Sequence, residues 1–191
     1  LRRQRQMCIR DRFETDAGYI GYNTTEYHNE YTAPNWLAFR LTDDNKFEFL
    51  GKEGFFERTT IHNWDFDSEE EEEIQEMADN YEKTKVNITK YGTLVDVYYP
   101  EYKGKLNKKN YLERLGGEIE YSNWCSTIEE EEYPKAFKMD IEDGKDDVVF
   151  DISYQGNPFY LVAETNVFHW VGAGAYTIML YEPVSRIVLY T

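Results

Sequence analysis

The chain has 191 residues and a mass of 22.8 kDa, so it is long enough for one domain or two very small ones. Its 37 acidic and 21 basic residues give a formal net charge of −16, which disfavours nucleic acid and anionic membrane surfaces as partners. Aromatic residues make up 17% of the chain, enough for a packed core despite a mean hydropathy of −0.75, and no apolar run is long enough to span a membrane.

The first twelve residues, LRRQRQMCIRDR, differ from the rest of the chain because they hold five Arg and one Asp. They lack the serines of a transit peptide and the apolar stretch of a secretory signal. The string resembles the translated read-through of a sequencing adapter, which occurs at the ends of open reading frames in metagenomic assemblies. We therefore expect residues 1–12 to be a non-native artefact and residues 13–191 to form a single domain. That body has 16 basic and 36 acidic residues, a net charge of −20, and Cys125 as its one cysteine.

Two short β-rich runs open the body. Residues 36–41 (WLAFRL) and 46–51 (KFEFLG) flank the turn formers TDDN, and this pattern predicts a hairpin. Phe47 and Phe49 alternate with charged residues, as in a half-buried strand. A poorer strand is expected over residues 55–61.

A long helix is predicted over residues 69–91. Ser68 and Glu71 match a capping box at its start, and Gly92 is suited to its end. Residues at alternating spacings of three and four then form one stripe along it: Ile74, Met77, Tyr81, Thr84, Ile88 and Tyr91. Such a stripe is typical of a helix that buries one face.

The middle of the chain gives weaker signals. Residues 94–99 (LVDVYY) are apolar enough for a strand that Pro100 would close. A short helix is expected over residues 108–115, between a capping Asn107 and Gly116. Residues 119–132 show no regular pattern.

The last third of the chain is rich in strands. The predicted strands are residues 135–141, 147–154, 158–165, 175–181 and 186–190. Turn-forming residues separate them, and the last two resemble the first hairpin in build. Strand-rich ends around two helices predict an α+β domain with a mostly antiparallel sheet. The chain stops at Thr191 with no turn or polar tail, so we expect a truncated C-terminus, with a strand that ends the natural chain as the alternative.

Three histidines are the first candidates for a chemical site: His28, His62 and His169. A zinc site needs several ligands at compatible spacing, and no such motif is present. We interpret these residues as ordinary histidines and expect no metal and no cofactor. A pairing of Cys125 with a histidine, as nucleophile and base, is the alternative.

Asp65, Asp67 and Glu69 resemble the first oxygen ligands of a calcium loop, with Glu76 at the twelfth position. The sixth position is Glu70, where that loop needs glycine. An acid-rich, capped helix start explains the same residues, so a calcium-dependent module is the weaker hypothesis.

A glycine-rich loop at residues 172–174 is followed by a strand, which excludes a dinucleotide fingerprint. Three aromatic residues precede the loop: Phe168, His169 and Trp170. Core packing is the favoured interpretation of these rings, and a contact site is the alternative.

Residues 115–181 resemble the YwqG-like family of bacterial proteins. The resemblance rests on Gly116–Gly117, an aromatic stretch at 121–124, Pro134, a strand at 159–163 and an aromatic-glycine loop and strand at 170–180. The family's usual Gln in the central strand is replaced here by Glu164. The biochemistry of this family is unassigned, and members have been proposed as immunity proteins in toxin systems. The resemblance implies an intracellular, non-catalytic binding role and supplies no catalytic residues.

The leading hypothesis is a non-enzymatic, cytoplasmic interaction protein, and its immunity-type form would bind a basic partner such as a nuclease toxin. The candidate binding residues are Trp124, Phe168, His169, Trp170, Glu129, Glu130, Glu131 and Glu132. The alternative is a small enzyme or ligand-binding domain with a pocket near Trp124, His169 and Trp170. The oligomeric state and the identity of the partner stay open.

Overall fold

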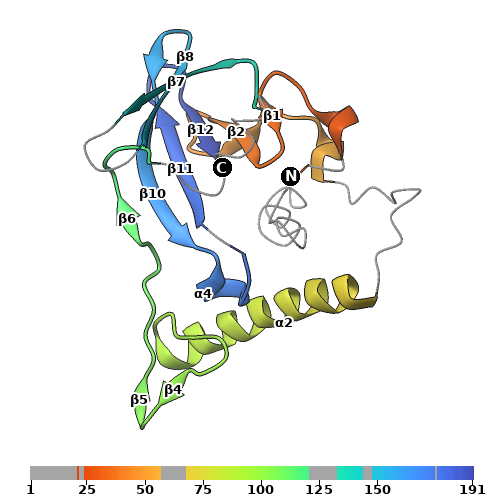
Figure 1. Cartoon of the computed structure of the whole chain (residues 1–191), viewed down its shortest axis with the longest axis vertical. Helices are drawn as coiled ribbons and strands as arrows, with labels where there is room; N and C mark the ends of the chain where they lie inside the picture. The colour runs from red at the N-terminus through yellow and green to blue at the C-terminus, as the bar shows by residue number, and fades with distance from the viewer. Residues whose placement is uncertain (1–20, 22–23, 57–67, 121–132, 144–147, 175) are drawn as a thin grey trace.

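The computed structural model of the chain is shown in Figure 1. It describes residues 21, 24–56, 68–120, 133–143, 148–174 and 176–191. In this part of the chain the predicted α+β class is confirmed: the paired strands are antiparallel, and one long helix lies along the side of the molecule. No helix within these ranges combines the length and the apolar character needed to cross a membrane.

The larger sheet has seven strands. They are β1 (Thr32–Ala33), β2 (Trp36–Leu41), β3 (Phe47–Phe49), β6 (Arg114–Leu115), β10 (Tyr160–Asn166), β11 (Tyr176–Glu182) and β12 (Ile187–Tyr190). Their order is β1-β2-β12-β11-β10-β6, with β3 paired to β2. Both predicted hairpins, β2–β3 and β11–β12, are confirmed, and they join through pairing of β2 with β12.

Strand β2 is buried on both faces, which explains why its sequence does not alternate. Trp36 and Ala38 belong to the larger core cluster on one side of the sheet, whereas Leu37 and Phe39 belong to a second cluster on the other side. The second cluster also holds Phe55, from a 3-10 helix η2 (Glu53–Phe56) that packs near another, η1 (Thr25–Tyr27). A strand covered on both faces is expected to be continuously apolar.

A second, three-stranded sheet consists of β7 (Phe137–Asp143), β8 (Val148–Tyr154) and β9 (Asn157–Pro158). The predicted strand at 158–165 is divided between the two sheets, because β9 pairs with β8 while β10 pairs with β11. The chain therefore changes sheet at Phe159, whose buried ring packs on Phe137 with ring centroids 5.4 Å apart. Side chains of both sheets share the larger core cluster, which makes the two sheets one packed unit.

Helix α2 (Ser68–Tyr91) confirms the predicted long helix. Its buried face carries Met77, Asn80 and Thr84, close to the predicted stripe. The face packs on α4 (Phe168–Val171), a four-residue helix that follows β10. The contact is small: among the described side chains, its buried apolar cluster consists of Met77, Val167 and Val171, with Tyr81, Trp170 and Ala173 partly buried against it. Helix α2 thus lies away from the sheets, as Figure 1 shows.

The predicted helix over residues 108–115 is wrong. This segment is extended, and its backbone amides bond to distant carbonyls: Lys109 donates to Leu94 at 3.0 Å and Glu113 donates to Glu164 at 2.8 Å. An amide used in this way cannot also donate to the carbonyl four residues before it, as a helix requires.

Two predicted strands also differ from the structure. Residues 94–99 form only one isolated bridge, Val95 with Lys108, because Asp96 accepts the amides of Tyr98 and Tyr99 and turns the chain. The regular hairpin comes next, as β4 (Glu101–Tyr102) and β5 (Lys105–Leu106). In the predicted strand at 55–61, residues 55 and 56 belong to η2, and the others lie outside the described residues.

Candidate functional site

The predicted site residues fall in two groups. Trp124 and the acidic run Glu129–Glu132 lie outside the described residues, as do Cys125, His62, Asp65 and Asp67. Phe168, His169 and Trp170 form most of helix α4, between β10 and the glycine-rich loop.

The three residues of α4 make mainly structural contacts. The Trp170 indole donates to Thr165 Oγ1 at 3.3 Å, and its ring lies 5.9 Å from the ring of Tyr111. His169 Nε2 lies 3.3 Å from a carboxylate oxygen of Glu113. Phe168 is 43% exposed and is the one of the three that offers an open apolar surface.

The carbonyl groups at the end of α4 are bound by side chains from outside it. Thr84 Oγ1 donates to the Trp170 carbonyl at 2.9 Å, and Asn80 Nδ2 donates to the Val171 carbonyl at 3.1 Å. The hydroxyl of Tyr98 donates to the Gly172 carbonyl at 3.3 Å. The last carbonyls of a helix have no partner within it, so these bonds supply the missing donors. Through these carbonyl groups the aromatic segment joins α2 to the sheet. Its rings do not lie in the buried core, contrary to the favoured interpretation: Phe168 is exposed, and His169 and Trp170 are half-buried.

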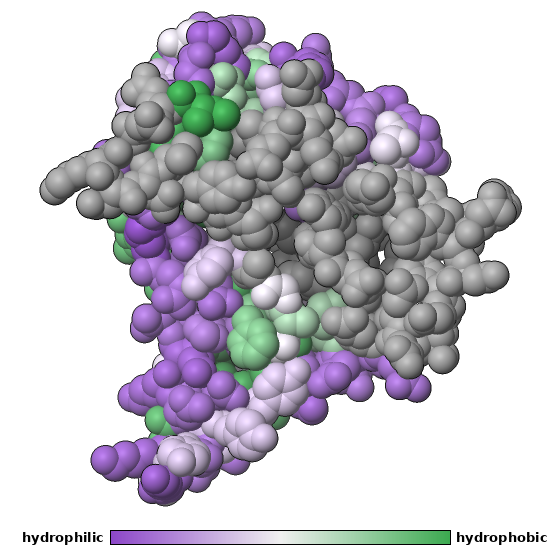
Figure 2. Space-filling model, viewed as in Figure 1, coloured by the Kyte–Doolittle hydropathy of each residue, from purple (hydrophilic) through white to green (hydrophobic). Residues whose placement is uncertain are grey.

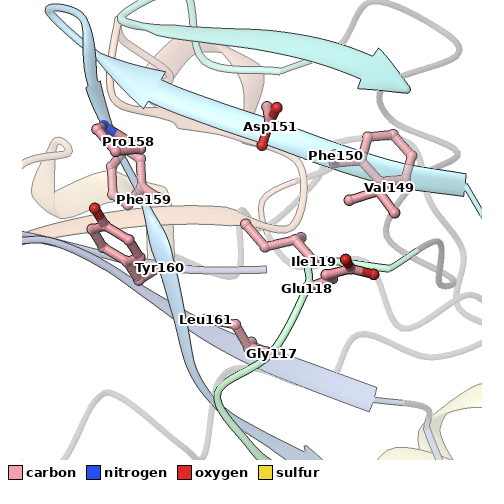
Figure 3. Close-up of a pocket in the computed structure, with 10 residues that line it drawn as sticks. All are labelled: Gly117, Glu118, Ile119, Val149, Phe150, Asp151, Pro158, Phe159, Tyr160 and Leu161. Carbon is pink, nitrogen blue, oxygen red and sulfur yellow. The ribbon is translucent and has the colours of Figure 1, made fainter. Parts of the chain in front are cut away.

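An open cleft of about 480 Å³ lies elsewhere, between β8 and the β9–β10 segment (Figure 3). Its lining residues are Gly117, Glu118, Ile119, Val149, Phe150, Asp151, Pro158, Phe159, Tyr160 and Leu161. Neither His169 nor Trp170 is among them, so the cleft is not the pocket that the sequence predicts near those residues.

The side chains of the cleft alternate along both strands. Phe159 and Leu161 are buried in the core, whereas Pro158 and Tyr160 face the opening, and β8 exposes Asp151 in the same way. Two exposed carboxylates, a phenol and an apolar floor would suit a small cationic or hydroxyl-bearing molecule. Within the described ranges, no group of three or more His, Cys, Asp or Glu side chains is arranged to hold a metal ion.

A second surface feature is a projecting segment, residues 98–112, which we call the hairpin arm. Figure 1 shows it at the C-terminal end of α2, with β4 and β5 at its tip. Six of the fifteen exposed large hydrophobic side chains in the described part of the chain belong to it: Tyr98, Tyr99, Tyr102, Leu106, Tyr111 and Leu112. Figure 2 shows pale residues on this projection, among strongly hydrophilic ones. Such a concentration on a surface is typical of an interaction site.

The tip of the arm is a tight turn. Lys103 and Gly104 have positive φ angles of 51° and 72°, as the two central residues of a type I′ turn require. Tyr102 and Lys105 pair across it. In the sequence, this hairpin is indicated by Lys103-Gly104, a pair that suits a tight turn, between two short β-rich segments.

The base of the arm is fixed by Asp96. Its carboxylate accepts the amides of Tyr98 at 3.1 Å and Tyr99 at 2.9 Å, and it lies 3.2 Å from Lys109 Nζ. Burial raises the pKa of Asp96, but the two amides and the Lys109 ammonium outweigh it and hold the pKa below the usual 3.8. Leu94 and Val95 are fully buried beside it, so the arm leaves the fold from an ordered base.

No family model, curated protein or solved structure matches this chain.

Proposed function

We propose that this protein is a non-enzymatic, cytoplasmic protein-interaction module. The observation that supports this most directly is the hairpin arm, which exposes six large hydrophobic side chains in fifteen residues. A monomeric protein rarely exposes such residues together unless they contact a partner, because their exposure to water is unfavourable. The segment is also ordered by Asp96 and by backbone bonds, as a preformed contact surface would be.

In its concrete form, the proposal is an immunity-type protein whose acidic surface binds a basic partner. The net charge of −20 in residues 13–191 supports it, since complementary charge steers association. Helix α2 adds to this support: residues 68–82 contain eight acidic residues and no Lys or Arg, and Glu72 and Asp79 are exposed. The resemblance of residues 115–181 to the YwqG-like family points in the same direction.

The test uses small basic nuclease domains as probes, with association rates measured at low and at physiological salt. We expect the rate to fall by about tenfold or more as salt rises, and to fall again when Glu129–Glu132 are replaced by Lys. Replacement of Lys138 by Glu, on β7, is the control and should not slow association. Rates that respond neither to salt nor to the reversal of Glu129–Glu132 would contradict the proposal.

A second candidate function follows from the cleft between β8 and β10. Its volume of about 480 Å³ lies in the range of small-molecule sites, roughly 300–1,000 Å³. We propose as the alternative that it binds a cationic or hydroxyl-bearing ligand through Asp151, Glu118 and Tyr160. Thermal melts with simple polyamines and sugars test this: a rise in melting temperature that Asp151→Asn abolishes supports the alternative, and unchanged melts contradict it.

A further inference from the structure

The hairpin arm has the opposite charge to the rest of the molecule. Residues 98–112 contain four lysines and one glutamate, a net charge of +3, in a chain with 37 acidic residues. Lys109 is paired with Asp96, and Lys103 lies over the ring of its neighbour Tyr102 at 5.1 Å. Lys105 and Lys108 are exposed, and their side chains make no ion pair or hydrogen bond with any residue that the structure describes. Two lysines beside the exposed tyrosines of the arm are thus left available.

We propose that the hairpin arm binds an extended, acidic segment of a partner polypeptide. The carboxylates of that segment would pair with Lys103, Lys105 and Lys108. Its apolar side chains would cover Tyr99 and Tyr102, which are 70% and 62% exposed. Aromatic residues beside cations are typical of the energetically important part of an interface. This surface is distinct from the acidic one proposed for a basic partner.

Two observations favour a polypeptide over a nucleic acid. Strands β4 and β5 pair only with each other within the described ranges, so each keeps an outer edge with unpaired backbone groups. An extended peptide can add to such an edge by hydrogen bonds, and a nucleic acid cannot do so in register. Outside the arm, residues 13–191 have 12 basic and 35 acidic residues, a net charge of −23, which would repel a long polyanion that extends beyond the arm. A short acidic segment would contact the arm alone.

The arm needs little rearrangement to bind. Backbone hydrogen bonds join its two sides. The Asp96 amide donates to the Asn107 carbonyl at 2.9 Å, and the Asn107 amide donates to the Pro100 carbonyl at 2.9 Å. The hydroxyl of Tyr98 fixes it to α2 through Asn80 and Glu76, both at 3.2 Å. A surface held in this way loses little conformational entropy when a partner binds.

The experiment measures fluorescence anisotropy of a dye-labelled peptide of alternating Glu and Leu residues. The arm variant Lys105→Glu/Lys108→Glu is compared with the control Lys135→Glu/Lys138→Glu, which changes the net charge by the same amount at β7 and the turn before it. We expect the arm variant to weaken binding by about tenfold or more, since two ion pairs become repulsive contacts, and the control to change it by less than about threefold. Tyr99→Ser/Tyr102→Ser should also weaken binding by about tenfold.

Several results would overturn the proposal. An equal loss in the arm and control variants would mean that only the overall charge matters. Tighter binding of a single-stranded oligonucleotide or of vesicles with anionic lipid would assign the arm to another class of partner, and a dimer dissolved by the arm variant would assign it to self-association. A matching peptide of Lys and Leu tests the acidic surface instead, and the arm variant should not weaken its binding. Failure of the basic-partner proposal is thereby distinguished from failure of this one.

Discussion

We predict that Gly172→Ala, at the point where α2, α4 and the arm meet, destabilises the protein much more than Gly156→Ala. Both glycines have left-handed backbones, with φ of 78° and 83°. A Cβ at Gly156 meets nothing within 4 Å, so that substitution costs only the backbone strain, about 1–2 kcal/mol. A Cβ at Gly172 would lie 2.7 Å from Tyr98 Cζ and 2.8 Å from Asn80 Nδ2, well inside contact distance.

The extra cost at Gly172 follows from the bonds that must break. To make room, the Tyr98 hydroxyl must leave its place, where it bonds to the Gly172 carbonyl, Asn80 and Glu76. The hydroxyl has one hydrogen, so it donates to Gly172 or to Glu76 while it accepts from Asn80. Each such bond is worth about 0.5–1.5 kcal/mol, so the loss of these two adds about 2 kcal/mol to the strain. In a domain of this size, that is a further fall in melting temperature of about 4–8 °C.

Thermal melts followed by circular dichroism measure this difference. Because both variants replace Gly by Ala, the effect on the unfolded chain is the same and cancels in the comparison. Equal melting temperatures for the two variants would refute the description of this joint, since the strain alone would then account for both.

Three further predictions test other contacts. Asn80→Ala leaves a buried α4 carbonyl without its donor and should cost about 2–3 kcal/mol in urea unfolding, whereas the exposed neighbour Asp79→Ala should stay within about 0.5 kcal/mol of the parent. Glu182 is fully buried and accepts two amides of the β11–β12 turn at 2.5 and 2.8 Å, so Glu182→Ala should cost about 3 kcal/mol in the same assay. The lowered pKa of Asp96 means that its contribution to stability is present above the unfolded value of about 3.8 and is lost as the pH falls through the lower folded value. Asp96→Asn should therefore reduce the acid-side fall in stability, measured by melts below pH 4, and an unchanged acid limb would contradict it.

The parts of the fold that the sequence predicted are those in which local signals and tertiary contacts agree. The hairpins β2–β3 and β11–β12 are flanked by strong turn formers, and the stripe and capping pattern of α2 lie within one segment. The wrong helix over residues 108–115 shows the limit of this reasoning. Its asparagine and glycine boundaries are suited to a helix, but carbonyl partners at Leu94 and Glu164 decide its conformation, and both are distant in sequence.

The candidate site was less predictable for the same reason. The aromatic run Phe168–Trp170 was recognised, but the favoured core packing is not what the structure has: Phe168 is exposed, and His169 and Trp170 are half-buried. Asn80 and Tyr98 were not singled out. These two side chains donate hydrogen bonds to carbonyls that are 91 and 74 positions away, and no local sequence pattern predicts such a contact. The arm was not predicted, because its first tyrosines belong to an apolar run that is typical of a strand. Only the structure distinguishes an exposed aromatic residue from a core one.

The two halves of this molecule should differ in local stability. Among the side chains that the structure describes, the sheets share a core of thirteen buried residues, whereas α2 meets α4 through a buried cluster of three, helped by the polar contacts of Asn80, Thr84 and Tyr98. Opening of α2 and the arm exposes much less apolar surface than separation of the sheets, so it requires less free energy. Hydrogen exchange should therefore be faster at the amides of residues 77–91 than at those of β11 and β12, and Asn80→Ala should accelerate exchange in α2 and the arm but not in β11 and β12. Equal protection of the amides of α2 and β12 from exchange would contradict this prediction. It would show that the contacts between α2, α4 and the arm are as stable as the core of the sheets.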